Sequence, residues 1–206
     1  MTHQSDTREA LLERFRVDSI TEGALRAIAR KGASATMQDI ADESGIAKGT
    51  LYLYFKDRDE LLHRVSEGAL SQLLAKIEDV FARALPFEET IRELVLTKLR
   101  FFDERRDLYR VHFELRFPGG RDPLCDARKA APPKEKQMYV DRLTRYFEQA
   151  LENKEDAPRL ALFLSETVAA VLFRRIPEQG GPKLENDAEF LSDLLLNGLS
   201  GRRKKS

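Results

Sequence analysis

Apolar residues recur every three to four positions along nearly the whole chain, and no segment alternates strictly between apolar and polar residues. The first spacing places apolar side chains on one face of an α-helix, whereas strict alternation is typical of a half-buried strand. Since the helical spacing runs through most of the 206 residues, the sequence predicts an all-α fold with about nine helices.

Glycine and proline residues divide this pattern into separate helices. A polar arm, residues 1–15, precedes a first helix that ends near Gly32 and buries Val17, Ile20, Ala24, Ala27 and Ile28. Two segments, 118–133 and 177–187, contain several glycines and prolines and are expected to be loops. Helices are expected within the ranges 36–45, 47–54, 57–85, 91–102, 108–115, 134–153, 158–175 and 188–199.

Residues 36–62 contain the densest set of local signals. Thr36 with Asp39 three positions later is a capping-box pattern, and Gly45 suits a left-handed helix end. Asp57 with Glu60 marks the start of a long helix in the same way. Two short helices joined by a tight turn form a helix-turn-helix, which we place at about residues 39–58.

The second short helix has an outward face suited to a DNA groove. Leu51 and Phe55 are four residues apart and face inward, which turns small, hydroxyl, basic and aromatic side chains outward. A helical hairpin in an ordinary bundle does not explain two exposed tyrosines beside Lys48, Lys56 and Arg58. The predicted DNA-binding residues are Thr36, Ala47, Lys48, Gly49, Thr50, Tyr52, Leu53, Tyr54, Lys56 and Arg58.

The motifs Thr36-x-x-Asp-Ile-Ala, Gly45-Ile-Ala-Lys-Gly-Thr-Leu-Tyr-x-Tyr-Phe and Lys56-x-Arg-x-Glu-Leu-Leu62 resemble the DNA-binding domain of the TetR family of bacterial transcriptional regulators. The chain departs from the family pattern at Ala47 and Asp57, where serine is usual, and at Arg58, where lysine is usual. The resemblance implies a DNA-binding domain at 16–62, a ligand-sensing and dimerisation domain at 63–200 and a basic tail at 201–206.

The resemblance also implies a homodimer that binds a palindromic double-stranded DNA operator and releases it when a small amphipathic or hydrophobic effector binds. Aromatic residues concentrate where the effector would bind, although aromatics at helical spacing also form ordinary cores. The candidate ligand-binding residues are Phe102, Tyr109, His112, Phe113, Tyr139, Arg142 and Phe147.

The last two predicted helices have apolar faces that could pack against a second copy of the chain in a four-helix bundle. The same faces could instead form intrachain core, and both roles can hold for different faces of one helix. The candidate dimer residues are Leu164, Val168, Val171, Leu172, Phe190 and Leu194.

Composition narrows the remaining classes. Lys and Arg total 35, as do Asp and Glu, so the formal net charge is zero and a nonspecific nucleic-acid coat protein is disfavoured. The single cysteine, Cys125, suits a reducing cytoplasm and is expected to be an inert thiol rather than a redox sensor. No signal peptide or membrane span is apparent.

An enzyme is the rival reading from another class. The three histidines are scattered, and no phosphate-binding glycine loop, zinc motif or nucleophile elbow occurs, so we expect no enzymatic activity, cofactor or metal. The expected function is a ligand-released transcriptional repressor. The alternative is a helix-turn-helix protein without an effector that acts through protein partners, and ligand-dependent release from DNA would separate the two.

Overall fold

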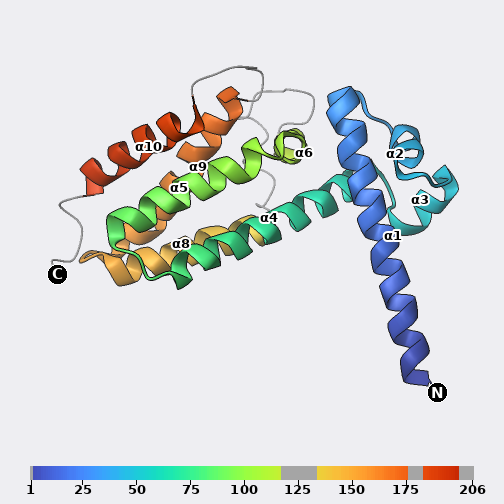
Figure 1. The fold of residues 1–206 in the computed structure, drawn as a ribbon, viewed down its shortest axis with the longest axis horizontal. Helices are drawn as coiled ribbons and strands as arrows, with labels where there is room; N and C mark the ends of the chain where they lie inside the picture. Colours follow the sequence, from blue (N-terminus) through green and yellow to red (C-terminus); the bar gives the residue numbers. More distant parts are fainter. Residues whose placement is uncertain (1, 117–133, 176–182, 200–206) are drawn as a thin grey trace. The chain divides into compact units, whose positions relative to one another are not determined.

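A computed structural model of the chain describes residues 2–116, 134–175 and 183–199 (Figure 1). This part of the chain is all-α, as predicted, and contains nine α-helices with short 3-10 turns at Gly32–Ser34 and Lys154–Asp156. The helices are α1 (Thr2–Lys31), α2 (Met37–Ser44), α3 (Lys48–Tyr54), α4 (Arg58–Ala82), α5 (Phe87–Asp103), α6 (Arg106–Arg116), α8 (Lys134–Ala150), α9 (Ala157–Arg175) and α10 (Leu184–Leu199).

Three helices, α1, α5 and α10, begin four or more residues before their expected starts, and α5 begins at Phe87 rather than at 91. Helix α1 begins at Thr2 and includes the polar arm, because residues 2–15 contain strong helix formers and neither glycine nor proline. Helix α10 begins four residues before the expected start, with Glu185 and Asp187 in a first turn that favours negative charge. The predicted loop at 118–133, with Cys125, and the basic tail lie outside the described residues.

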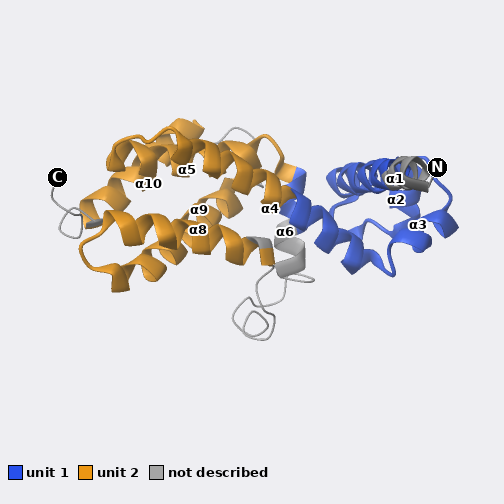
Figure 2. Ribbon diagram, turned by 90° about the horizontal axis from the view of Figure 1, so that it is seen from below, with its two compact units in different colours: residues 1–68, 107–130 blue, residues 69–106, 131–206 orange. Residues whose placement is uncertain are grey.

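The chain divides into two compact units (Figure 2). Unit 1 comprises residues 1–68 and 107–130, and unit 2 comprises residues 69–106 and 131–206. Helix α4 contributes its first turns to unit 1 and the remainder to unit 2. Most of α6 is grouped with the N-terminal residues in unit 1.

Unit 1 is built on the packing of α1 against α2. The predicted inner face of α1 is buried except for Val17, which is half-buried, and Ile40, Leu51 and Leu61 complete the core. At Gly23 the two helices approach so closely that an added Cβ would lie 1.9 Å from Ser44 Oγ and 2.8 Å from the Ser44 backbone nitrogen. Glycine at this position therefore permits the contact on which the N-terminal unit is assembled.

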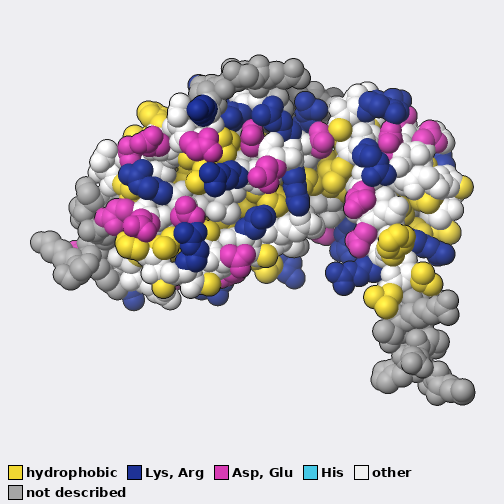
Figure 3. Space-filling view, viewed as in Figure 1, with side chains coloured by type: hydrophobic (Ala, Val, Ile, Leu, Met, Phe, Trp, Pro, Cys, Tyr) yellow, Lys and Arg dark blue, Asp and Glu magenta, His cyan; other side chains and the backbone are white. Residues whose placement is uncertain are grey.

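Unit 2 is a helical bundle in which α8 packs on α9, and α5 packs on both α9 and α10. Ion pairs join its helices at the surface, as between Arg142 and Glu78 (2.7 Å) and between Arg92 and Asp193 (2.6 Å). In the face that Figure 3 presents, basic and acidic side chains are interspersed. The core residues are Leu73, Ile77, Ile91, Leu94, Val95, Leu99, Leu143, Phe147, Leu164, Val168, Leu172, Leu191 and Leu195.

None of the helices described is long and apolar enough to cross a membrane.

Replacing Gly23 by alanine should destabilise the protein by about 1–3 kcal/mol, because the new methyl group overlaps the backbone of α2 and forces the helices apart. Urea unfolding monitored by circular dichroism measures this change.

Gly68→Ala is the matched control, because Gly68 lies in α4 and an added Cβ there meets nothing within 4 Å. It should stabilise the protein by about 0.5–1 kcal/mol through helix propensity. Equal stabilities of the two variants would contradict the proposed close approach of α1 and α2.

Candidate nucleic-acid interface

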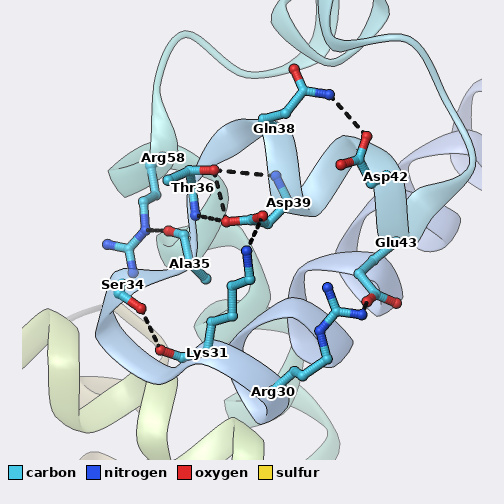
Figure 4. Close-up of polar contacts among 10 residues, drawn as sticks. All are labelled: Arg30, Lys31, Ser34, Ala35, Thr36, Gln38, Asp39, Asp42, Glu43 and Arg58. Atoms are coloured by element: carbon cyan, nitrogen blue, oxygen red, sulfur yellow. Dashed lines mark hydrogen bonds and ion pairs between the residues drawn. The ribbon is translucent and has the colours of Figure 1, made fainter.

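Helix α2 begins at the capping box that the sequence predicts. The Asp39 backbone N–H donates to Thr36 Oγ1 (3.2 Å), and the Thr36 backbone N–H donates to Asp39 Oδ2 (2.9 Å) (Figure 4). Lys31 Nζ donates to the other oxygen of Asp39 at 2.6 Å. The hydrogen bond from Lys31, with those from Thr36, holds the pKa of Asp39 well below its usual range.

The turn between α2 and α3 depends on Gly45. Its φ of 69° is left-handed, which a residue with a Cβ adopts only with strain. The Ile46 N–H then donates back to the Ala41 carbonyl at 3.1 Å, which closes the turn. Helix α3 begins at Lys48, and Ala47 is its N-cap residue. Ala47 makes no side-chain capping bond, as expected for alanine at this position.

Helix α3 has one buried and one exposed face. Leu51 is fully buried and Phe55, just beyond the helix, is 4% exposed, whereas Tyr52 is 49% and Leu53 82% exposed. Lys48 and Gly49 are also exposed. The structure thus presents a cation, a phenol, an aliphatic side chain and an uncovered stretch of backbone on one short helix, which is the combination that base and phosphate contacts require.

Tyr54 is less exposed than the sequence suggested. Its side chain is half-buried, as is Thr50, and its hydroxyl accepts a hydrogen bond from Arg16 Nη1 of α1 at 3.2 Å. Arg16 was absent from the predicted site, because it lies 38 residues before Tyr54 and no local motif connects the two. The contact adds a cation to the edge of the α3 surface.

Arg58 and Lys56, both predicted to contact DNA, also form hydrogen bonds within the protein near the start of α4. Arg58 Nε donates to the Ala35 carbonyl at 2.8 Å and so ties α4 to the segment before α2 (Figure 4). Asp57 caps α4, since its Oδ1 accepts from the Glu60 N–H at 2.9 Å, and Glu60 Oε2 accepts from the Lys56 N–H at 2.7 Å. The Lys56 side chain is 86% exposed.

Acidic residues near this surface are largely paired. Glu43 pairs with Arg30 at 2.7 Å and Asp39 pairs with Lys31 at 2.6 Å (Figure 4). Glu43 also lies 3.7 Å from Arg26. Asp57 is half-exposed and lies 3.8 Å from the Lys56 ammonium. The α3 surface is therefore less acidic than the sequence around it suggests.

The candidate ligand-binding residues separate in the structure. Phe102, Tyr139 and Phe147 are buried in unit 2, whereas Tyr109 is buried in unit 1. Arg142 pairs with Glu78 and lies over the Phe81 ring at 4.1 Å. The side chains of His112 and Phe113 lie outside the described part.

A pocket beside Phe147 does not provide an open ligand site. Its lining is apolar and it has no room for a water molecule, so the side chains around it behave as packed core. The lining residues are Ile91, Phe147, Leu160, Leu164 and Leu195.

The sequence did not predict that a lysine of unit 2 is buried. Lys98 of α5 is 6% exposed, and its Nζ donates to the Ser165 carbonyl at 2.8 Å and to Ser165 Oγ at 3.3 Å. Burial lowers the pKa of Lys98 to about 7. In sequence Lys98 only looks like a polar interruption of the apolar face of α5, where lysine usually extends to solvent.

The predicted dimer residues differ in how much of each side chain is exposed to solvent. Leu164, Val168 and Leu172 are at most 3% exposed within their own chain, where they pack in the core of unit 2, and their part in a dimer stays a prediction. Val171 is half-buried, and Phe190 and Leu194 of α10 are 68% and 53% exposed. The exposed large apolar residues of α9 are Leu162, Phe163 and Phe173, which occupy a different face.

Comparisons with known proteins agree with this geometry. Residues 20–65 match the family model for bacterial regulatory proteins of the tetR family. Over 70 residues the chain is 39% identical to an HTH-type transcriptional regulator of Haemophilus influenzae (34% of this chain, 37% of that protein). Over 76 residues it is 33% identical to the HTH-type transcriptional repressor KstR2 of Rhodococcus jostii (36% of this chain, 37% of the repressor). Each alignment thus spans little more than a third of the relative.

The similarity of fold extends further. The transcriptional regulator FadR from Bacillus subtilis, solved in complex with stearoyl-CoA, superposes with a TM-score of 0.70 at 17% identity and covers 87% of this chain and 97% of its own. At this identity the match establishes the fold.

Lys98 should make stability depend on pH. Because its folded pKa of about 7 lies below its ordinary value of 10.5, the folded state is penalised below pH 7 and the penalty is relieved as pH rises toward 10.5. Lys98→Met removes this group. Its stability advantage over the parent should shrink between pH 7 and pH 10, by up to ~1.4 kcal/mol per pH unit.

Urea unfolding at several pH values measures the difference, with exposed Lys76→Met as control. A constant gap between Lys98→Met and the parent would contradict the burial of an ionisable amine at this position.

Proposed function

Residues 20–65 belong to the tetR family of bacterial regulatory proteins, and from this premise we propose that the chain is a sequence-specific DNA-binding transcriptional repressor. It acts as a cytoplasmic homodimer that binds a palindromic operator and releases it when a small effector binds. The observation that carries the proposal is the exposed face of α3, held between the Gly45 turn and the capped start of α4.

Each group on this face has a role in the proposal. Lys48 contacts a phosphate or the edge of a guanine, and Gly49 and Ala47 let the backbone approach the DNA closely. Tyr52 and Leu53 reach base edges, with Leu53 against a thymine methyl. Arg16 and Lys56 bind phosphates at the two sides of α3. Exposed Thr36 and the half-buried residues Thr50, Tyr54 and Arg58 contact the DNA backbone.

A dimer supplies the second half-site. Exposed apolar residues lie on both C-terminal helices of unit 2, with Leu162, Phe163 and Phe173 on α9 and Phe190 and Leu194 on α10. Residues of this size on a solvent-facing surface favour association with a second copy. The dimer would place its two recognition helices about 34–36 Å apart, or a multiple of it, to meet successive major grooves.

Effector control is the second part of the proposal. FadR of similar fold binds stearoyl-CoA, and unit 2 of this chain is rich in buried aromatic side chains. An effector that prefers the non-binding form of the dimer lowers DNA affinity, typically by a coupling of ~1–3 kcal/mol. Helix α4 belongs to both units and is the continuous element through which such coupling would act.

The alternative is a helix-turn-helix DNA-binding protein that has no small-molecule effector and acts through protein partners. It uses the same α3 surface, so DNA binding does not separate the two functions. Release of operator DNA by a small molecule supports the effector-controlled form, and binding that changes only with a partner protein supports the alternative.

The deciding experiment is an anisotropy titration of the full-length protein against DNA from upstream of its own gene, with nonspecific competitor present. The parent should form a tight complex with two half-sites. Tyr52→Ala should lose specific binding while keeping its circular dichroism spectrum, because Tyr52 is exposed and supports no core packing. Operator binding by this variant at parental affinity would rule out α3 as the recognition helix.

Lys48→Ala should weaken binding and reduce the slope of log K against log salt by about one unit per half-site if its ammonium neutralises a phosphate. Lys76→Ala is the control, since Lys76 is also an exposed helical lysine but lies on α4 in unit 2. An unchanged slope in Lys48→Ala would mean that Lys48 contacts a base or no DNA at all.

A further inference from the structure

The surroundings of Lys98 contain too little negative charge for a buried ammonium. Its two hydrogen-bond acceptors, the carbonyl and hydroxyl of Ser165, are neutral, and Nζ lies 4.9 Å from the centre of the Tyr139 ring. Burying an ammonium without an opposite charge is strongly unfavourable. An anion placed beside Lys98 Nζ would therefore relieve the cost of its burial.

The nearest charges do not compensate Lys98. Lys136 of α8 bonds Glu166 of α9 at 2.6 Å, so the one carboxylate nearby is already paired. Glu166 attracts the Lys98 ammonium and Lys136 repels it. Across the described ranges no carboxylate lies within 4.0 Å of Lys98 Nζ, and two ammonium groups share one carboxylate.

Tyr139 of α8 contributes a hydroxyl donor on the ring that Lys98 contacts. It is 3% exposed, and burial raises its pKa, so its hydroxyl stays protonated at physiological pH. Because the Lys98 ammonium lies 4.9 Å from the centre of this ring, a group bound to one side chain lies near the other.

The side chains beside these donors are apolar. Phe102 lies one helical turn after Lys98 on α5, and Leu143 lies one turn after Tyr139 on α8, and both are buried. A ligand held here would need an anionic end for the two donors and an apolar body for the surrounding side chains.

We propose that Lys98 and Tyr139 bind the carboxylate of a small amphipathic organic acid, and that this acid is the effector. The assignment rests on the proposed ligand-controlled repression and names the chemical class of its ligand. The carboxylate supplies the charge that Lys98 lacks and accepts a hydrogen bond from the Tyr139 hydroxyl. Bound anion also favours the protonated amine, so affinity should fall as pH rises above neutrality.

The test compares three probes with one ten-carbon chain, namely decanoate, decanol and decylammonium, by calorimetric titration of the full-length protein. The parent should bind decanoate at least about tenfold more tightly than decanol. Lys98→Met, which keeps the length of the side chain and removes the charge, should bind both equally. Lys76→Met is the matched control and should keep the parental preference.

Tyr139→Phe removes only the hydroxyl and should weaken decanoate binding about three- to tenfold without changing decanol binding. If Lys98→Met does not fold, the loss of decanoate affinity in Tyr139→Phe tests the proposed carboxylate site instead. The preference of the parent for decanoate should also decline between pH 7 and pH 9, while decanol binding stays constant.

Absence of a decanoate preference in the parent, or its survival in Lys98→Met, would overturn the assignment. Operator binding without any probe keeps this failure separate from failure of the proposed function. If the parent and Lys98→Met both bind DNA but neither prefers decanoate, the repressor proposal stands and only the ligand site falls. If the parent binds no operator, the proposed function fails whatever the probes do.

Discussion

Gly45 carries the constraint on which the DNA-facing surface depends. Only three residues separate α2 from α3, and the chain reverses there through one left-handed residue and a hydrogen bond from Ile46 to Ala41. Helix α3 has seven residues and no side-chain cap, so it is too short to be stable alone. Its position follows from the turn before it and from the burial of Leu51 and Phe55 after it. The side chains that would read DNA are therefore oriented by packing on the opposite face of the same short helix.

Electrostatic pairing completes this arrangement. Acidic residues are numerous around α3, and unpaired they would repel a phosphate backbone. Lys31 pairs with Asp39, and Arg30 pairs with Glu43. These ion pairs hold α2 against the C-terminal end of α1 and neutralise the two carboxylates. Lys48 and Lys56 extend from the surface at the edge, although the Lys56 ammonium lies 3.8 Å from Asp57. One set of charges thus stabilises the domain, and another remains for a polyanion, which is how a chain of zero net charge can present a DNA-binding surface.

In unit 2, by contrast, one buried charge lacks an opposite charge to pair with. A well-packed bundle would gain stability from an apolar residue at position 98, and the chain instead buries an amine whose pKa falls to about 7. The nearby Lys136–Glu166 pair leaves one positive charge in excess. A cost to stability at one place is common where a protein binds a ligand, because the ligand supplies what the empty site lacks. The N-terminal unit shows no comparable cost among its described residues.

Sequence alone determined the features that arise from neighbouring residues. The helical periodicity, the Thr36–Asp39 cap, the Gly45 turn and the inward positions of Leu51 and Phe55 are set within a few residues, and the structure contains all of them. Tertiary structure decided whatever depends on which face of a helix meets another helix. Leu164, Val168 and Leu172 are buried within their own chain, Arg16 reaches Tyr54, and Lys98 is buried rather than solvated. Periodicity shows that a helix has an apolar face but not what covers it, because burial is a property of the packed chain and contacts between distant segments leave no local pattern.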